Sequence, residues 1–243
     1  MLSIGSHISP NIDTQEFISL AAKDKLLVWL RNSRQFNGGA NASCSESEWV
    51  DVSGHNNHAV MEDEAAQAEA SLGGLHFDGS SSYMDFTTKM EIGQETGFAI
   101  FTVMTLDANT NEVWLSDSAN EFIEMQTSSK IRIKTTGTGS GNITSVFTSG
   151  SGAMFGTGNA MLITITRTAA GELKVYKDGV EAAGTISNNP NAGAIDIFNL
   201  GCRNDADRFF DGIMHELVFY EAALSGDDLS NVHSYLNSKF GLS

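Results

Sequence analysis

Pairs of acidic side chains on one strand face would be the acid and the nucleophile of a glycoside hydrolase. A retaining enzyme needs the two carboxyl groups about 5 Å apart, which requires an even offset along a strand. Glu121 and Glu124 differ by three positions and Asp211 and Glu216 by five, so each pair is expected to point to opposite faces. A third pair, around Gly93, has an even offset but lies in a polar stretch typical of a loop. The sequence therefore predicts no catalytic residues and no enzyme.

Carboxylates and amides in predicted loops are the second candidate chemistry, because calcium takes oxygen ligands from loops. The candidate ligands are Asp51, Asn56, Asn57, Asp78, Asp205, Asp207 and Asp211. A structural alternative exists for two of them, since Asp51 with Ser53, and Asp78 before Gly79, would close turns by hydrogen bonds. The two histidines of residues 55–58 lack a third zinc ligand at a suitable spacing. Calcium is therefore the one cofactor that the sequence leads us to expect.

Aromatic rings exposed beside polar loops would provide a surface for a sugar ring. Trp49, Trp114 and Phe209 are the candidates, and Phe209 lies close to a predicted loop tip at 203–208. A β-fold of this size also needs aromatic residues in its core, so burial is the structural alternative for each tryptophan. Trp29, inside the apolar run LVWL, is assigned to the core.

The chain is strongly acidic, with 14 Lys and Arg against 30 Asp and Glu and a formal net charge of -16. This charge repels nucleic acids and anionic membranes, so neither is an expected partner. The sequence has no apolar stretch long enough to span a bilayer and no features of a Sec signal peptide. Work outside a cell would then require a non-Sec route, such as release within a virus particle. Cys44 and Cys202 leave open one disulfide or, as their scarcity favours, two buried thiols.

The C-terminal stretch, residues 208–243, organises the predicted fold. Residues 214–220 are almost entirely apolar or aromatic, which is typical of a strand covered on both faces. Ser225 and Asp228 then form a capping box that predicts the start of a helix. The buried stripe of this helix and its stop are predicted at Leu229, Val232, Leu236, Phe240 and Gly241.

Ahead of this stretch the sequence predicts short strands joined by tight turns. The predicted strands are 25–31, 75–79, 82–86, 97–107, 112–117, 121–127, 130–136, 142–148, 160–168, 171–177, 180–186, 195–201 and 211–220. In residues 130–136 the isoleucines are predicted to face the core and the basic residues to face outward. Asp178 and Gly179 predict a two-residue hairpin turn. Short strands at regular intervals without a βαβ rhythm indicate an all-β, two-sheet antiparallel sandwich.

Three segments, in order, resemble one family of β-sandwiches. Residues 49–60 (WVDVSGHNNHAV), 75–86 (LHFDGSSSYMDF) and 211–236 are similar to motifs of laminin-G-like, concanavalin-A-like lectin jelly rolls. The resemblance implies a jelly roll over residues 25–243, and it makes a bound calcium ion and glycan binding reasonable expectations. The same fold carries lectins, hydrolases and structural modules, so function must be argued from a site.

Residues 1–24 precede the predicted jelly roll and form an arm with a short helix expected at about 14–23. Its candidate docking residues are Ile8, Ile12, Phe17 and Leu20. An arm joined to one jelly roll resembles phage virion accessory proteins, which decorate capsids or form parts of tails and fibres. We therefore expect a non-catalytic virion protein, oligomeric within its assembly, whose arm docks on neighbouring subunits and whose sandwich binds cell-surface glycans. The alternatives are a cellular lectin or adhesin and a glycoside hydrolase of the same fold.

Overall fold

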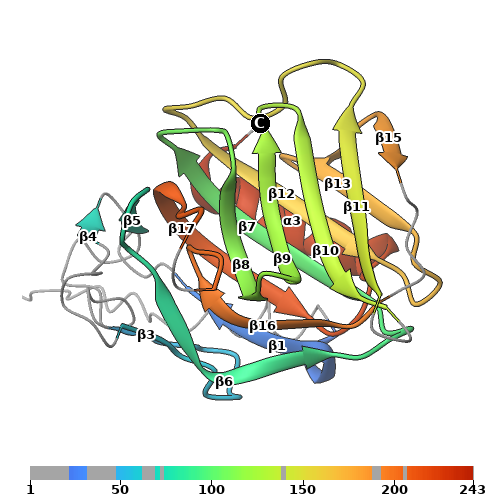
Figure 1. Ribbon diagram of the computed structural model, residues 1–243, viewed down its shortest axis with the longest axis horizontal. Helices are drawn as coiled ribbons and strands as arrows, with labels where there is room; N and C mark the ends of the chain where they lie inside the picture. Colours follow the sequence, from blue (N-terminus) through green and yellow to red (C-terminus); the bar gives the residue numbers. More distant parts are fainter. Residues whose placement is uncertain are drawn as a thin grey trace, which may run out of the picture.

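The computed structural model describes residues 22–31, 48–61, 69–71, 74–137, 141–187, 193–204 and 207–242. Most of the predicted arm and its helix, the four docking residues, Cys44 and Asp205 lie outside these ranges. Residues Lys23–Lys25 form a 3-10 turn, η1. The strands form two antiparallel sheets packed face to face (Figure 1), which confirms the predicted all-β sandwich.

The eight-stranded sheet is built around the longest strand, β17 (Asp211–Tyr220). In order it contains β14 (Val180–Glu181), β13 (Leu173–Lys177), β12 (Ala160–Arg167), β7 (Phe98–Leu106), β17, β5 (Gly74–Asp78) and β4 (Glu69–Ser71), with β1 (Leu26–Leu30) also on β17. One edge of β17 pairs with β7, and the other pairs with β5 and then with β1. Residues 214–220 are buried throughout, as their apolar composition predicts.

The nine-stranded sheet covers the other side of the sandwich. In order it contains β15 (Gly184–Ser187), β11 (Asn142–Ser149), β10 (Lys130–Thr136), β9 (Glu121–Thr127), β8 (Glu112–Ser118), β16 (Ile195–Leu200), β6 (Met84–Ile92), β3 (Ala59–Val60) and β2 (Glu48–Trp49). Alternation along β10 sends its isoleucines into the core and Arg132 and Lys134 to the opposite face, as predicted. The surface of the nine-stranded sheet that points away from the eight-stranded sheet is called the outer face.

Two hydrophobic cores hold the layers together. The larger one lies between the sheets and includes Trp49, Phe77, Trp114, Ile133 and Phe219. The smaller one lies on the opposite side of the eight-stranded sheet, where α3 (Gly226–Phe240) packs behind it in Figure 1. None of the helices in the described ranges is long and apolar enough to cross a membrane.

The predicted C-terminal helix is confirmed in its position and differs in its cap. It starts directly after Ser225 and ends at Gly241, which has a left-handed φ of 64°. Of the predicted stripe, Val232 and Leu236 are buried, and Leu229 is partly buried beside them. The Ser225 side chain makes no capping hydrogen bond. The capping-box pattern therefore predicted the correct start of the helix, although the hydrogen bond that defines a capping box is not formed.

Candidate functional site

The Asp51 carboxylate is buried and saturated with hydrogen bonds. Oδ1 accepts from the backbone N–H groups of Trp29 and Ser53, each at 2.8 Å. Oδ2 accepts from Ser53 Oγ at 2.7 Å and from the backbone N–H of Asn57 at 2.9 Å. Four donors already point at these two oxygens, so Asp51 fits its turn-closing alternative better than the predicted calcium site. Asn57 likewise holds the chain, since its Nδ2 donates to Leu27 O at 2.8 Å.

Asp78 is a second turn anchor. Its Oδ1 accepts the backbone N–H groups of Ser80, Ser81 and Ser82 at 2.8 to 2.9 Å, and Oδ2 accepts two serine hydroxyls. Burial alone would raise the pKa of this carboxyl, but the hydrogen bonds outweigh it and hold the pKa well below its usual range. Donors occupy the positions that a cation would need.

Asp211 is the predicted calcium ligand that meets other metal-binding groups. One ligand atom from each of His76, Asp107 and Asp211 lies within 4.8 Å of the others. Burial and then the charge of Asp107 raise the pKa of Asp211, and the charge of His76 lowers it. His76 and Asp107 were not predicted, because they come from β5 and from the end of β7 and are distant in sequence from Asp211. Asp207 is instead paired with Arg203.

Two of the three predicted sugar-binding aromatics lie in the core. Trp49 is 0% exposed and Trp114 is 1% exposed. A ring without exposed area cannot stack on a sugar, so the prediction for these two tryptophans is wrong, and the structural alternative holds. Phe209 is half-buried and lies against Tyr83, with the ring centroids 6.5 Å apart.

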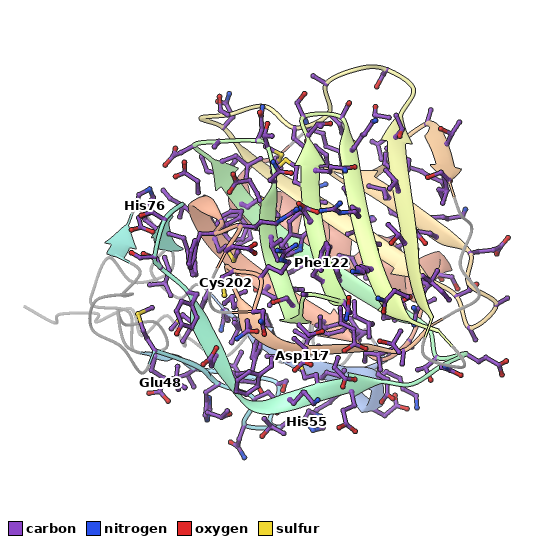
Figure 2. The ribbon with its side chains drawn as sticks, viewed as in Figure 1. Glu48, His55, His76, Asp117, Phe122 and Cys202 are labelled. Atoms are coloured by element: carbon purple, nitrogen blue, oxygen red, sulfur yellow. The ribbon has the colours of Figure 1, made fainter. Side chains whose placement is uncertain are left out.

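The outer face of the nine-stranded sheet brings together residues that sequence reasoning did not assign to a site. Across β9 and β10, Arg132 is opposite Glu124 and Lys134 is opposite Phe122. Figure 2 shows Phe122 on the sheet that faces the viewer. Arg203 and Arg208 reach the same place from the segment between β16 and β17. We call Arg132, Lys134, Arg203 and Arg208 the basic cluster.

Glu124 is the buried centre of the basic cluster. It is 0% exposed, and its two oxygens are paired with Arg132 and Arg208, whose side chains are 20% and 30% exposed. A charged carboxylate at this depth requires such partners. Because both of its oxygens are paired, Glu124 orients the two guanidinium groups.

Phe122 forms the apolar floor under three of the cations. The Arg132 and Arg203 guanidinium carbons lie 5.2 and 5.8 Å from its ring centroid, and Lys134 Nζ lies 5.9 Å away. These distances are within the range of cation–π attraction. The ring is 2% exposed, so the charged groups and not the ring form the surface that a ligand would meet.

The segment that carries Arg203 and Arg208 is tied to β8. Gly201 N–H donates to Trp114 O at 3.0 Å, and Val113 N–H donates to Arg208 O at 3.2 Å. Ser116 Oγ donates to the carbonyl oxygen of Cys202 at 2.7 Å. These bonds fix the backbone on both sides of the loop, so its two arginines are held over the sheet by the fold.

A group of carboxylates lies on the same sheet beside the basic cluster. Asp117, Glu121 and Asp196, called the acidic cluster here, have one oxygen each within 4.8 Å of the others. Lys89 Nζ lies 3.0 Å from Asp196 and 3.8 Å from Asp117. Burial is the main cause that raises the pKa values of Asp117 and Glu121. The search for pairs within one strand missed this group because its members come from β8, β9 and β16.

Comparison with known proteins agrees with this architecture. Residues 78–230 match the Laminin_G_3 family, described as the concanavalin A-like lectin/glucanases superfamily. A search of curated proteins found no match.

Similar solved structures share the fold at low sequence identity. The ligand-binding domain of botulinum neurotoxin serotype D in complex with N-acetylneuraminic acid is 15% identical, with a TM-score of 0.59, over 90% of this chain and 52% of that chain. Trypanosoma rangeli sialidase, as a covalent intermediate with 2,3-difluorosialic acid, is 14% identical, with a TM-score of 0.57, over 93% of this chain and 37% of that chain. This chain thus spans about half or less of each. From the match over residues 78–230, the chain belongs to the concanavalin A-like lectin/glucanases superfamily.

Proposed function

We propose that this protein is a non-catalytic carbohydrate-binding jelly roll whose binding site is the outer face around Phe122. The basic cluster carries the proposal, because its four side chains converge from β10 and from the 201–210 segment on one place. Fixed, partly exposed hydrogen-bond donors on a rigid sheet are what a sugar-binding site requires. Membership of a superfamily that includes lectins supports the same function.

A glycan array, read with and without calcium, tests the proposal. The wild-type protein should bind a defined set of glycans, and Lys134→Gln should weaken that binding. Lys174→Gln removes the same charge from an exposed position of β13, in the other sheet, and should leave binding unchanged. Silence of the wild-type protein under both conditions would refute carbohydrate binding and leave display or structural support as the function.

The proposal places this domain in a virion, with residues 1–24 as a docking arm on neighbouring capsid or tail subunits. Its support is the resemblance of an arm joined to one jelly roll to virion accessory proteins. Deleting residues 1–24 should leave the melting temperature of the sandwich nearly unchanged and abolish incorporation into the assembly. Normal incorporation of the truncated chain, measured on purified particles, would refute docking by the arm.

The acidic cluster supports a second candidate function, glycoside hydrolysis. Retaining enzymes hold two carboxyl groups about 5 Å apart, one of them with a raised pKa, and Asp117 and Glu121 meet both conditions. Hydrolysis of a bound glycan that is lost in Glu121→Gln and kept in Glu91→Gln would establish this function. Retention of the intact glycan by the wild-type protein would support binding alone.

For the calcium ion expected from the sequence, we propose the group of Asp107, Asp211 and His76. Asp107 and Asp211 offer oxygen ligands, which suit calcium, whereas the His76 nitrogen suits a transition metal better. Calcium should therefore raise the melting temperature of the wild-type protein and not that of Asp107→Asn. A rise with zinc alone would assign the group to a transition metal.

A further inference from the structure

We propose that the basic cluster selects acidic sugars, binding the carboxylate of a sugar acid in preference to neutral sugars. The inference rests on the proposed function and specifies its ligand class. It concerns the four cations around Phe122 and their two acidic partners, Glu124 and Asp207.

The charge of this site opposes the charge of the whole chain. Only 14 residues of the chain are Lys or Arg, and its formal net charge is -16. Four of those 14 residues form the basic cluster, against two carboxylates in contact with it, Glu124 and Asp207. Counting these direct contacts alone, four minus two leaves a surplus of two positive charges around the arginines, and the three carboxylates of the acidic cluster lie to one side on the same sheet. A local surplus of this kind in an acidic protein attracts anions to one place and repels them elsewhere.

The arginines at the centre are positioned for a planar anion. Arg132 uses Nε and Nη2 on Glu124, and Arg208 uses Nη1. The terminal nitrogens that are not used on Glu124 are Nη1 of Arg132 and Nη2 of Arg208. Both belong to partly exposed side chains. A guanidinium group carries five N–H donors in a fixed fork that matches a carboxylate. Because Glu124 already fixes both groups, little side-chain freedom would be lost when a ligand binds.

Arg203 adds a cation whose present partner can be exchanged. Its carboxylate partner, Asp207, is 49% exposed and four residues away in the same loop. The Arg203 side chain is 21% exposed, so the ion pair is open to solvent on the Asp207 side, and the carboxylate of a ligand would compete with Asp207 for the guanidinium group. Lys134 borders the site from β10, where its Nζ donates to Ala119 O at 3.0 Å and to Asn120 Oδ1 at 2.8 Å.

The neighbouring acidic cluster gives the ligand an orientation. The Glu121 side chain of β9 is hydrogen-bonded to Thr136, the next outward residue after Lys134 in β10. The carboxylates of the acidic cluster would repel the acid group of a sugar and accept hydrogen bonds from the hydroxyls of that sugar. The acid group would therefore lie over the arginines and the hydroxyls toward Glu121.

Isothermal titration calorimetry with four sugars tests the inference. N-acetylneuraminic acid and glucuronic acid should bind at least about tenfold more tightly than galactose and glucose, and more weakly as salt is added. Arg203→Gln and Lys134→Gln should each lower the affinity for the acidic sugars roughly tenfold. The exposed Lys174→Gln should not change it. Both test positions avoid the partners of buried Glu124, so the variants should fold.

The outcomes separate the two proposals. Equal affinity for acidic and neutral sugars would overturn the acidic selection and leave carbohydrate binding intact. No binding of any sugar, together with a silent glycan array, would overturn both. Acidic sugars that bind Arg203→Gln and Lys134→Gln as tightly as the wild-type protein would overturn the assignment to the basic cluster.

Discussion

Glu216 shows how one buried side chain can join three elements of the fold. Its Oε1 accepts a hydrogen bond from Trp29 Nε1 of β1 at 2.7 Å, and its Oε2 pairs with Lys239 of α3. The carboxylate is 0% exposed and the Lys239 side chain is 2% exposed. Its contacts with the Trp29 indole and the Lys239 ammonium group are therefore structural.

Replacing Glu216 by alanine should cost about 3 to 5 kcal/mol of the free energy of unfolding, because Lys239 would remain buried without its counter-charge. Urea unfolding of the purified variant measures this loss. The matched control is Glu181→Ala, which removes an exposed carboxylate paired with Lys174 and should cost less than about 1 kcal/mol. Equal losses in the two variants would contradict the role assigned to Glu216.

At the scale of elements, strand β17 depends on one glycine for its contact with β7. Gly212 is opposite Leu106 in the ladder and has a φ of 145°. A Cβ at this position would lie 2.2 Å from the backbone oxygen of Thr105. A side chain would therefore force the two strands apart at the start of β17.

Gly212→Ala should lower the free energy of unfolding by about 2 kcal/mol or more, through strain and loss of strand pairing. Chemical denaturation gives the value, and the fluorescence of the buried tryptophans reports the transition. Gly156→Ala is the control, since a Cβ there has no neighbour within 4 Å and should change stability little. Normal stability of Gly212→Ala would show that β17 can shift without loss.

Most strands could be predicted from the sequence because alternation and turn residues act locally. The predicted strands at 121–127, 130–136 and 211–220 have the observed bounds, and Asp178 and Gly179 form the expected turn with positive φ values. The predicted strand at 180–186 is instead two strands, β14 and β15, in different sheets. Local sequence pattern does not show where a chain crosses from one sheet to the other.

At the scale of the whole molecule, negative charge opposes compaction. A formal net charge of -16 implies mutual repulsion that the folded state increases and that salt screens. Raising NaCl from about 20 mM to about 300 mM should therefore raise the melting temperature by about 3 °C. Differential scanning calorimetry measures the change, and the same salt should weaken binding of acidic sugars. An unchanged melting temperature would mean that the acidic side chains are already compensated.

The sequence alone determined the all-β class, the central position of the last strand and the helix that follows it. These features depend on the spacing of apolar residues within short segments, because that spacing determines which face of a strand or helix is buried. Only the tertiary structure decided that Trp49 and Trp114 are buried and which residues form the two charged clusters. Arg132 and Arg208 are 76 positions apart in number, yet they meet at Glu124. Sheet pairing and the 201–210 segment bring them together, and no pattern within a single strand contains that information.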